Sequence, residues 1–444
     1  MTIRVIKTKQ PLKDPAVLQL RDRLRGAELT AAGELAGLNV PAIVSGIIAD
    51  VRGRKDQALI DWQRKLDKAE LTADSIRVPR KRIKEAHSGA DPAFMSLIRR
   101  VIDNIWHYQQ SILVEEPPAL NRGGRQMGVR YTPIDRVGLY VPGGKAVLAS
   151  SLLMSAVPAQ VAGVGQIAIA CPPTCDGDIN PMVLAIAGEL NIDEVYRLGG
   201  AVAVAGLAYG TESVTPVDKI LGPGSAFVAE AKRQLFGQCG IDLLAGPTEI
   251  AIIADDSADP ALVACDLLGQ AEHDPNSGQL LICLSESFAR ATLGEVDKQL
   301  AVLPTKEVAE ISWSNNGKIY VADDRDEAIK LSDDYAAEHL ELHVEDTDYY
   351  CDRLTNYGSL FIGEETTVAY GDKSIGTNHI LPTSRSARYT GGVWVGKFLK
   401  TVTYQKMTPE ASIEVGKVTA RQCEVERMLA HAITATVRTE RNSR

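Results

Sequence analysis

The fold is decided by residues 250–273, IAIIADDSADPALVACDLLGQAEH. The first four residues form a short β-branched apolar run, which is typical of a buried strand. Asp259 followed by Pro260 then predicts an N-cap and a first helical position, and the apolar residues after them recur at helical spacing. A strand, a turn and an amphipathic helix in this order form the repeating unit of a parallel α/β sheet.

The same alternation extends in both directions from this stretch. Further apolar β-branched runs lie at 167–170, 194–198, 280–284, 319–321 and 340–344, and Gly-rich turns at 142–144, 199–200 and 222–224. We therefore expect an α/β protein with parallel strands and helices on both faces. Residues 1 to about 125 and the chain from Thr408 onward have helical patterns.

Length and composition narrow the classes of function. A chain of 444 residues suggests two or three domains. The net charge of −9 argues against non-specific nucleic-acid binding. The seven cysteines are scattered, which suggests reduced thiols in a cytoplasmic compartment. The N-terminus lacks the apolar core of a secretory signal, and the most apolar region, 146–173, is interrupted by Pro, Gln and Gly. We expect a cytoplasmic protein with no membrane or nucleic-acid partner.

Gln270 and His273 lie three residues apart near the end of the helix that begins at Pro260. Residues at this spacing share one helix face, so an amide oxygen and a ring nitrogen could converge on one metal ion. The alternative is a pair of polar side chains at a fraying helix end.

Three other polar clusters could complete such a site. Glu338 and His339 place two proton carriers side by side between a helix and a strand. Asp372, flanked by Gly371, could be an oxygen ligand on a loop, or only a turn residue. His431 lies on the last predicted helix. Gln, His, Asp and His would form a nitrogen and oxygen set that suits catalytic Zn²⁺.

The turn at Pro142, Gly143 and Gly144 follows a predicted strand, so its backbone N–H groups could face a phosphate. From the residues alone, the chain is an α/β enzyme with a candidate zinc site. The reaction stays open at this point, since a zinc hydrolase with Glu338 as its base or a non-catalytic binding module also fits.

Several segments, in order from about residue 35, resemble the histidinol dehydrogenase family. They read RVGLYVPGG (136–144), SSLLM (150–154) with PAQVAG (158–163), DKILGPG (218–224), AGPTE (245–249), QAEH (270–273), EHLE (338–341) and GTNHILPT (376–383). So many spaced motifs in one order are not expected by chance, and the chain is identified as a member of this superfamily.

The resemblance implies a zinc-dependent, NAD-linked oxidation of a primary alcohol to a carboxylate through an aldehyde, with two NAD per turnover and one Zn²⁺ per subunit. It places the zinc ligands on Gln270, His273, Asp372 and His431, the acid/base pair on Glu338 and His339, and substrate contacts on Thr248, His379 and Glu426. Cofactor contacts fall on Tyr140, Pro142, Gly143, Gly144, Val202 and Ser225.

The family fold consists of two incomplete Rossmann-like domains with parallel sheets and small helical terminal segments. The implied divisions are an N-terminal segment 1–34, a first domain 35–138 with 251–390, a second domain 139–250, and a C-terminal tail 391–444. The tail is expected to reach the partner in a domain-swapped homodimer, so that Glu426 and His431 serve the partner's site. These two residues lie five apart, about 140° around an ideal helix.

Departures from the family pattern bear on the substrate and the cofactor. Thr248 replaces a usual Ser, Val202 a usual Gln and Ser225 a usual Asn. Lys373, Arg388 and Lys397 are cations that histidinol would not favour, although ordinary surface charge would also explain them. With Trp394 they resemble the sulfopropanediol 3-dehydrogenase branch, which oxidises (R)-2,3-dihydroxypropane-1-sulfonate to sulfolactate. The alternative substrate is L-histidinol, which Glu426 and His379 favour.

Overall fold

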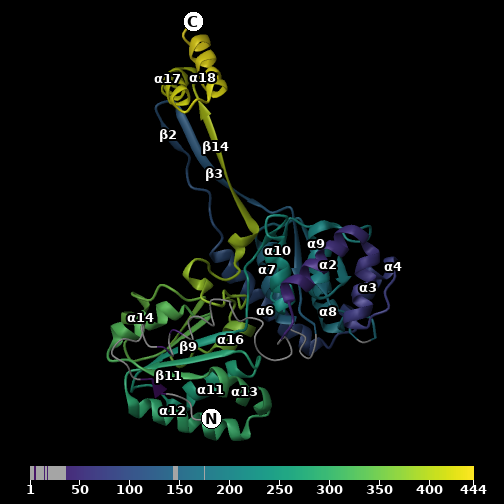
Figure 1. Cartoon of the computed structure of the whole chain (residues 1–444), viewed down its shortest axis with the longest axis vertical. Coiled ribbons are helices and arrows are strands. Elements are labelled where there is room, and N and C mark those ends of the chain that lie inside the picture. The colour runs from purple at the N-terminus through teal and green to yellow at the C-terminus, as the bar shows by residue number, and fades with distance from the viewer. Residues whose placement is uncertain (1–4, 7–14, 16–17, 19–36, 144–148, 175) are drawn as a thin grey trace.

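The structure is a computed structural model that describes residues 5–6, 15, 18, 37–143, 149–174 and 176–444. Most of the expected N-terminal segment, 1–34, and Gly144 lie outside these residues. Two α/β bodies stand side by side, and a long β-ribbon that carries a pair of helices projects away from them (Figure 1).

The first body is built on a six-stranded parallel sheet. Its strand order is β1 (Val5–Ile6), β11 (Lys318–Val321), β10 (Gly278–Cys283), β9 (Glu249–Ala254), β12 (His339–His343) and β13 (Ser359–Ile362). One face packs on α11 (Pro260–Ala271), α12 (Glu286–Val302), α13 (Lys306–Asn316) and α16 (Val368–Lys373). The other face packs on α14 (Arg325–Tyr335) and α15 (Thr347–Cys351).

The second body is built on a five-stranded sheet, also parallel. Its order is β6 (Val195–Arg197), β5 (Gln166–Cys171), β4 (Arg136–Tyr140), β7 (Lys219–Leu221) and β8 (Gly240–Ile241). One face is covered by α5 (Arg80–Ser88), α6 (Pro92–Ser111), α7 (Ala149–Val161) and α8 (Pro181–Glu189). The other is covered by α2 (Val40–Arg54), α3 (Asp56–Asp67), α4 (Ala73–Ile76), α9 (Gly200–Tyr209) and α10 (Ala226–Leu235).

The expected parallel α/β architecture is confirmed, and the predicted apolar runs become β5, β6, β9, β10, β11 and β12. The grouping of the N-terminal helices differs from the expected division. Residues 40–111 pack mainly on the five-stranded sheet, because the apolar faces of α2 and α6 complete its two cores, although Asn104 on α6 also donates to the Ser374 oxygen. That sheet also begins at Arg136 and not at residue 139.

The ribbon is an antiparallel sheet of β2 (Leu120–Arg122), β3 (Arg125–Pro133) and β14 (Leu399–Met407). The expectation of helix up to residue 125 is therefore wrong for β2. Beyond β14, the hydroxyl of Thr408 accepts from the Ala411 N–H and caps α17 (Pro409–Val425), as predicted. A sharp turn leads to α18 (Leu429–Asn442), which packs against α17.

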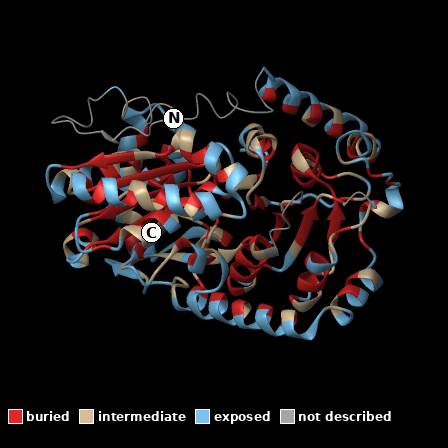
Figure 2. Cartoon of the chain, turned by 90° about the horizontal axis from the view of Figure 1, so that it is seen from below, coloured by how far each residue is buried: buried red, intermediate tan, exposed pale blue. Residues whose placement is uncertain are grey.

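Buried residues line the strands of both sheets, and the outward turns of the covering helices are exposed (Figure 2). Within the described part of the chain, no helix combines the length and the apolar character needed to cross a membrane.

Candidate functional site

His339 is fixed at the start of β12, where the chain leaves α14 through Ala336 in a left-handed conformation (φ 52°). Its Nδ1 lies 3.0 Å from the Glu249 carbonyl oxygen, which can only accept, so Nδ1 carries the proton. The other ring nitrogen, Nε2, is buried and has no hydrogen-bond partner among the described residues. It faces Asp372 Oδ1 at 3.9 Å. His339 therefore presents a free acceptor nitrogen to the site.

Glu338 is held by a chain of side-chain hydrogen bonds that begins on α11. Gln270 Nε2 donates to the Thr248 hydroxyl, which donates to Glu338 Oε2 at 2.5 Å. The Glu249 N–H donates to the same oxygen at 3.1 Å. Burial raises the pKa of the Glu338 carboxyl, although the His339 charge and these donors oppose the rise. Because the Gln270 amide nitrogen is used in this chain, its oxygen remains available as a ligand.

Asp372 lies in the last turn of α16 and not on a loop, so the expected loop position is wrong. The loop that follows joins the two bodies. His379 Nδ1 donates to the Asp372 backbone oxygen at 2.8 Å, and its Nε2 lies 3.1 Å from the Ser151 hydroxyl on α7. The neighbouring Asn378 donates to the Met154 oxygen, also on α7. Burial lowers the pKa of His379 more than the charge of Asp372 raises it.

His273 and Asp372 lie in one region beside His339, and Gln270 reaches the neighbouring Glu338 through Thr248. The imidazole of His273, beyond the end of α11, lies within electrostatic range of Asp372, Lys373 and His339. The three side chains offer oxygen, nitrogen and oxygen donors, and the orphaned Nε2 of buried His339 faces the same space. This donor set fits Zn²⁺ with a coordination position left for another ligand.

The cofactor positions lie at the carboxyl end of the five-stranded sheet, which is the usual ligand edge of an open α/β sheet. Tyr140 ends β4, and its hydroxyl accepts from the Gly200 N–H at 3.1 Å. A Cβ on Gly222 would lie 2.1 Å from the backbone carbonyl oxygen of Tyr140. Only glycine therefore allows this close approach of two backbone segments. Ser225 begins α10 with an exposed hydroxyl that makes no capping bond. Small residues and a free hydroxyl at this edge fit a dinucleotide.

The other expected cofactor positions are less open. Pro142 and Gly143 follow Tyr140 at the same edge, with Gly143 beside Pro172. Val202 is fully buried in the apolar core under α9, so its side chain makes no polar contact with a cofactor.

Four expected residues do not join the cluster within one chain. Glu426 and His431 lie on α17 and α18, at the far end of the ribbon from α11 and α16 (Figure 1). A turn at Arg427 (φ 60°) separates them, so they do not share one helix. Arg388 is exposed. The backbone oxygen of Lys397 accepts from Lys219 Nζ at the start of β7, which is the opposite edge of that sheet from Tyr140.

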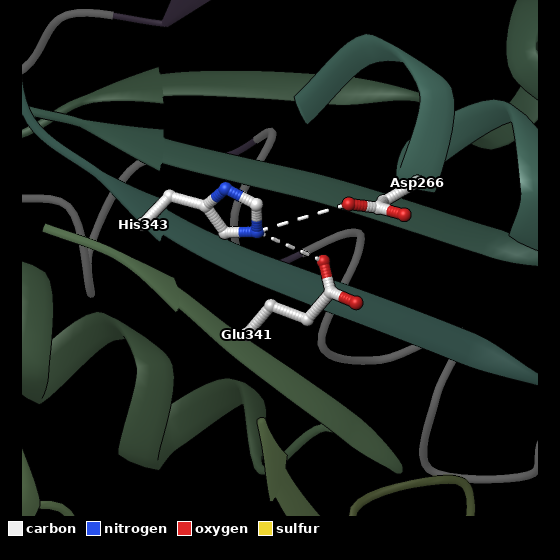
Figure 3. A group of neighbouring side chains, drawn as sticks. All are labelled: Asp266, Glu341 and His343. Atoms are coloured by element: carbon white, nitrogen blue, oxygen red, sulfur yellow. Dashed lines mark hydrogen bonds and ion pairs between the residues drawn. The ribbon is translucent and has the colours of Figure 1, made fainter. Parts of the chain in front are cut away.

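The sequence pattern gave no role to Glu249 or to the cluster of Asp266, Glu341 and His343, which lie near Glu338 and His339. Glu249 is 1% exposed and accepts from the Ser384 N–H, and burial together with the Glu338 charge raises its pKa well above the usual value. Asp266, Glu341 and His343 form a second cluster between α11 and β12 (Figure 3). The available signal was periodicity, since alternate residues of β12 are polar in an otherwise apolar strand.

Comparisons with known proteins show the family of the chain. The family model described as "Histidinol dehydrogenase" matches residues 33–439. The chain is 44% identical to "Histidinol dehydrogenase" of Ruegeria pomeroyi, covering 91% of this chain and 93% of the relative. It is 43% identical to "Histidinol dehydrogenase homolog" of Shouchella clausii, covering 90% and 95%. The crystal structure of histidinol dehydrogenase from Elizabethkingia anophelis superposes with a TM-score of 0.89 at 34% identity, covering 96% and 97%.

Proposed function

The chain belongs to the histidinol dehydrogenase family, and from this premise we propose which residues carry its reaction and which alcohol it oxidises. Enzymes of this family are zinc- and NAD-dependent oxidoreductases that take an alcohol through two hydride transfers to a carboxylate, and this chain is one of them. When bound, Zn²⁺ supplies a Lewis acid for the alcohol oxygen and NAD supplies the hydride acceptor.

We assign the zinc ligands to Gln270, His273 and Asp372 of one chain. The observation that carries this assignment is the buried, unpartnered Nε2 of His339, which faces Asp372 at 3.9 Å and lies within electrostatic range of His273. The fourth ligand of the proposal is His431 of a second copy of the chain.

The two proton carriers take separate steps in the proposal. His339 accepts the hydroxyl proton on Nε2, because Nδ1 is held as a donor by the Glu249 carbonyl. Glu338 accepts a proton from the water that adds to the aldehyde. Its pKa, raised by burial, makes it a stronger base than an exposed glutamate would be.

We propose a homodimer whose active sites are shared. The outer faces of α17 and α18 expose apolar side chains that one chain leaves uncovered: Val418, Val425, Leu429, Ile433 and Val437 are each more than half exposed. Such a surface at the end of a long ribbon favours contact with a second copy. The free state of the described cysteines supports a reducing location such as the cytoplasm.

We propose (R)-2,3-dihydroxypropane-1-sulfonate as the substrate, with sulfolactate as the product. Lys373 supports this choice, because its Nζ lies 3.8 Å from Asp372 Oδ2 and about half of its side chain is exposed. A cation beside the ligand cluster would attract a sulfonate and repel a protonated amine. Arg388 and Lys397 are not part of this proposal.

L-Histidinol is the second candidate, because several relatives with more than 40% identity carry the name histidinol dehydrogenase. The test supplies each alcohol to the zinc-loaded protein with NAD and follows NADH absorbance. The sulfonated diol should give two NADH per molecule oxidised, and Lys373→Ala should raise its KM about tenfold. Turnover of histidinol alone would refute the sulfonate proposal, and a zinc hydrolase would give no NADH with either alcohol.

A further inference from the structure

Asp266, Glu341 and His343 converge between α11 and β12 (Figure 3). His339, Glu341 and His343 alternate along β12 and so lie on one face of the sheet. The His343 Nε2 lies 3.3 Å from Glu341 Oε2 and 3.8 Å from Asp266 Oδ2. Glu341 and His343 have fully buried side chains, and that of Asp266 is 16% exposed. The site proposed above uses none of the three.

The carboxyl oxygens of Asp266 and Glu341 that do not face His343 accept hydrogen bonds from the start of α16. The Thr367 hydroxyl donates to Asp266 Oδ1 at 2.8 Å, and the Val368 N–H donates to Glu341 Oε1 at 3.0 Å. The cluster therefore joins three elements: α11 through Asp266, β12 through Glu341 and His343, and α16 through its first residues.

These elements are also the ones that carry the proposed zinc and proton-transfer residues. Gln270 follows Asp266 by one helical turn, His339 precedes Glu341 by two residues on the same face of β12, and Asp372 lies near the other end of α16. A shift of any element at the cluster would move the corresponding side chain at the site.

Two carboxyl groups and one imidazole meet in this cluster, and their charges act on one another. Burial, and then the Glu341 charge, raise the pKa of the Asp266 carboxyl to about 6, although the hydrogen bond from Thr367 and the His343 charge oppose the rise. Burial disfavours a charge on His343, but its hydrogen bond to Glu341 and the charges of Glu341, Asp266 and Glu364 outweigh burial and raise its pKa. Cys265 is the other titratable group close to the two acids.

We propose that Asp266, Glu341 and His343 are positioning residues that lock α11, β12 and α16 together so that Gln270, His339 and Asp372 converge on zinc. This inference rests on the zinc site of the proposed function. Residues that contact and orient the metal ligands contribute to metal affinity although they do not bind the metal themselves.

The test compares zinc affinity in four proteins: the unmodified chain, Glu341→Ala, Glu341→Gln and the exposed control Glu345→Ala. Chelator competition gives the zinc Kd, metal analysis gives the number of ions per chain, and the visible spectrum of the Co²⁺-substituted protein reports ligand geometry. Glu341→Ala should weaken zinc binding about 10- to 100-fold and change the cobalt spectrum, with the Kd for NAD unchanged. Glu341→Gln should keep more of the zinc affinity than Glu341→Ala does, because the amide oxygen can still accept from the Val368 N–H.

Thr367→Val removes only the hydroxyl that donates to Asp266, so it is the alternative variant if Glu341→Ala does not fold. It should weaken zinc binding less than Glu341→Ala does. An unmodified chain that binds no zinc would refute the proposed function. One zinc per chain with a Kd that Glu341→Ala and Thr367→Val leave unchanged would refute only the positioning role. Two zinc ions per chain, falling to one in Glu341→Ala, would show that the cluster is itself a metal site and would overturn the inference.

Discussion

His339 and Glu338 are neighbours in sequence, but their surroundings give them different proton chemistry. The imidazole is locked in one tautomer by a backbone carbonyl, whereas the carboxylate ends a hydrogen-bonded chain from Gln270 through Thr248. Neighbouring groups whose environments favour different protonation states are suited to separate acid and base roles. The two residues should therefore be separable by mutation.

We expect His339→Ala to suppress the first oxidation by about 10²- to 10⁴-fold, the usual contribution of a general base. Glu338→Ala should slow mainly the second oxidation, so that aldehyde accumulates. A carbonyl trap and the yield of NADH in a single turnover measure the two steps. His107→Ala is the matched control, because this histidine is exposed on α6 and should leave both steps intact. Equal loss of both steps in the two variants would contradict separate roles.

At the scale of elements, the loop after β7 must approach the end of β4 to form the cofactor edge. Gly222 has a φ of +120°, and Gly222→Ala would place a Cβ 2.1 Å from the backbone oxygen of Tyr140, so the loop would have to move. We expect the Kd for NAD to rise at least about tenfold, as judged by calorimetry, while zinc binding is retained. Gly237→Ala is the control, since this glycine also has a positive φ but no atom within 4 Å of the added Cβ. Equal effects of the two substitutions would assign the loss to backbone strain alone.

A surface ion pair between Arg99 and Glu189, joined by His87, links α5, α6 and α8 on one face of the same sheet. The Arg99 guanidinium lowers the pKa of Glu189 from 4.5 to about 2, and His87 adds to this effect. Burial of the carboxylate opposes the decrease but is the smaller effect. Because the folded pKa lies below the unfolded one, the pair stabilises the protein above pH 4.5, and this stability is lost as the pH falls toward 2. Because Arg99 is more than half exposed, solvent screens the interaction, and its contribution is about 1 kcal/mol or less.

Glu189→Gln should therefore lower the free energy of unfolding at pH 6 and flatten its decline between pH 5 and pH 3, as measured by urea denaturation. Glu85→Gln, at an exposed position on α5, should leave the pH dependence unchanged. If the stability of Glu189→Gln declined between pH 5 and pH 3 as steeply as that of the unmodified protein, the ion pair would not contribute to the free energy of unfolding.

The elements that the sequence predicted are those with a local signal. The run at Ile250–Ile253 and the Asp259–Pro260 start of α11 need no distant partner to be recognised. The ribbon was missed because β14 is largely exposed and β3 is only half-buried, so neither shows a fully buried face, and because they pair across more than 260 residues.

The same reasoning applies to the site. Gln270, Glu338 and Asp372 stand out as polar residues in readable motifs, and the structure brings them close. Glu249 and His343 gain their importance only from burial and from neighbours on other elements, which a single sequence does not reveal. The packing of α2 and α6 likewise depends on which sheet lacks a cover, and helical periodicity alone carries no such information.

At the scale of the whole molecule, one chain is incomplete as an enzyme under the proposed mechanism. The ribbon carries His431 and Glu426 away from the ligands on α11 and α16, and the apolar faces of α17 and α18 stay uncovered (Figure 1). A second copy would cover these faces and supply the missing ligand. Substitution of Ile433 by Asp should therefore convert a dimer to a monomer in sedimentation and reduce zinc retention together with activity.

Mixing two inactive variants tests the shared site directly. His339→Ala inactivates the α/β part of a chain but leaves its C-terminal tail intact. His431→Ala inactivates the tail but leaves the α/β part intact. After co-expression, or denaturation and refolding together, about half of the dimers are mixed, and each mixed dimer contains one intact site and one doubly defective site. Activity should return to about a quarter of that of the unmodified protein, while each variant alone stays inactive. If His431 served its own chain, the mixture would contain no intact site and would remain inactive, and the ribbon would then require another explanation.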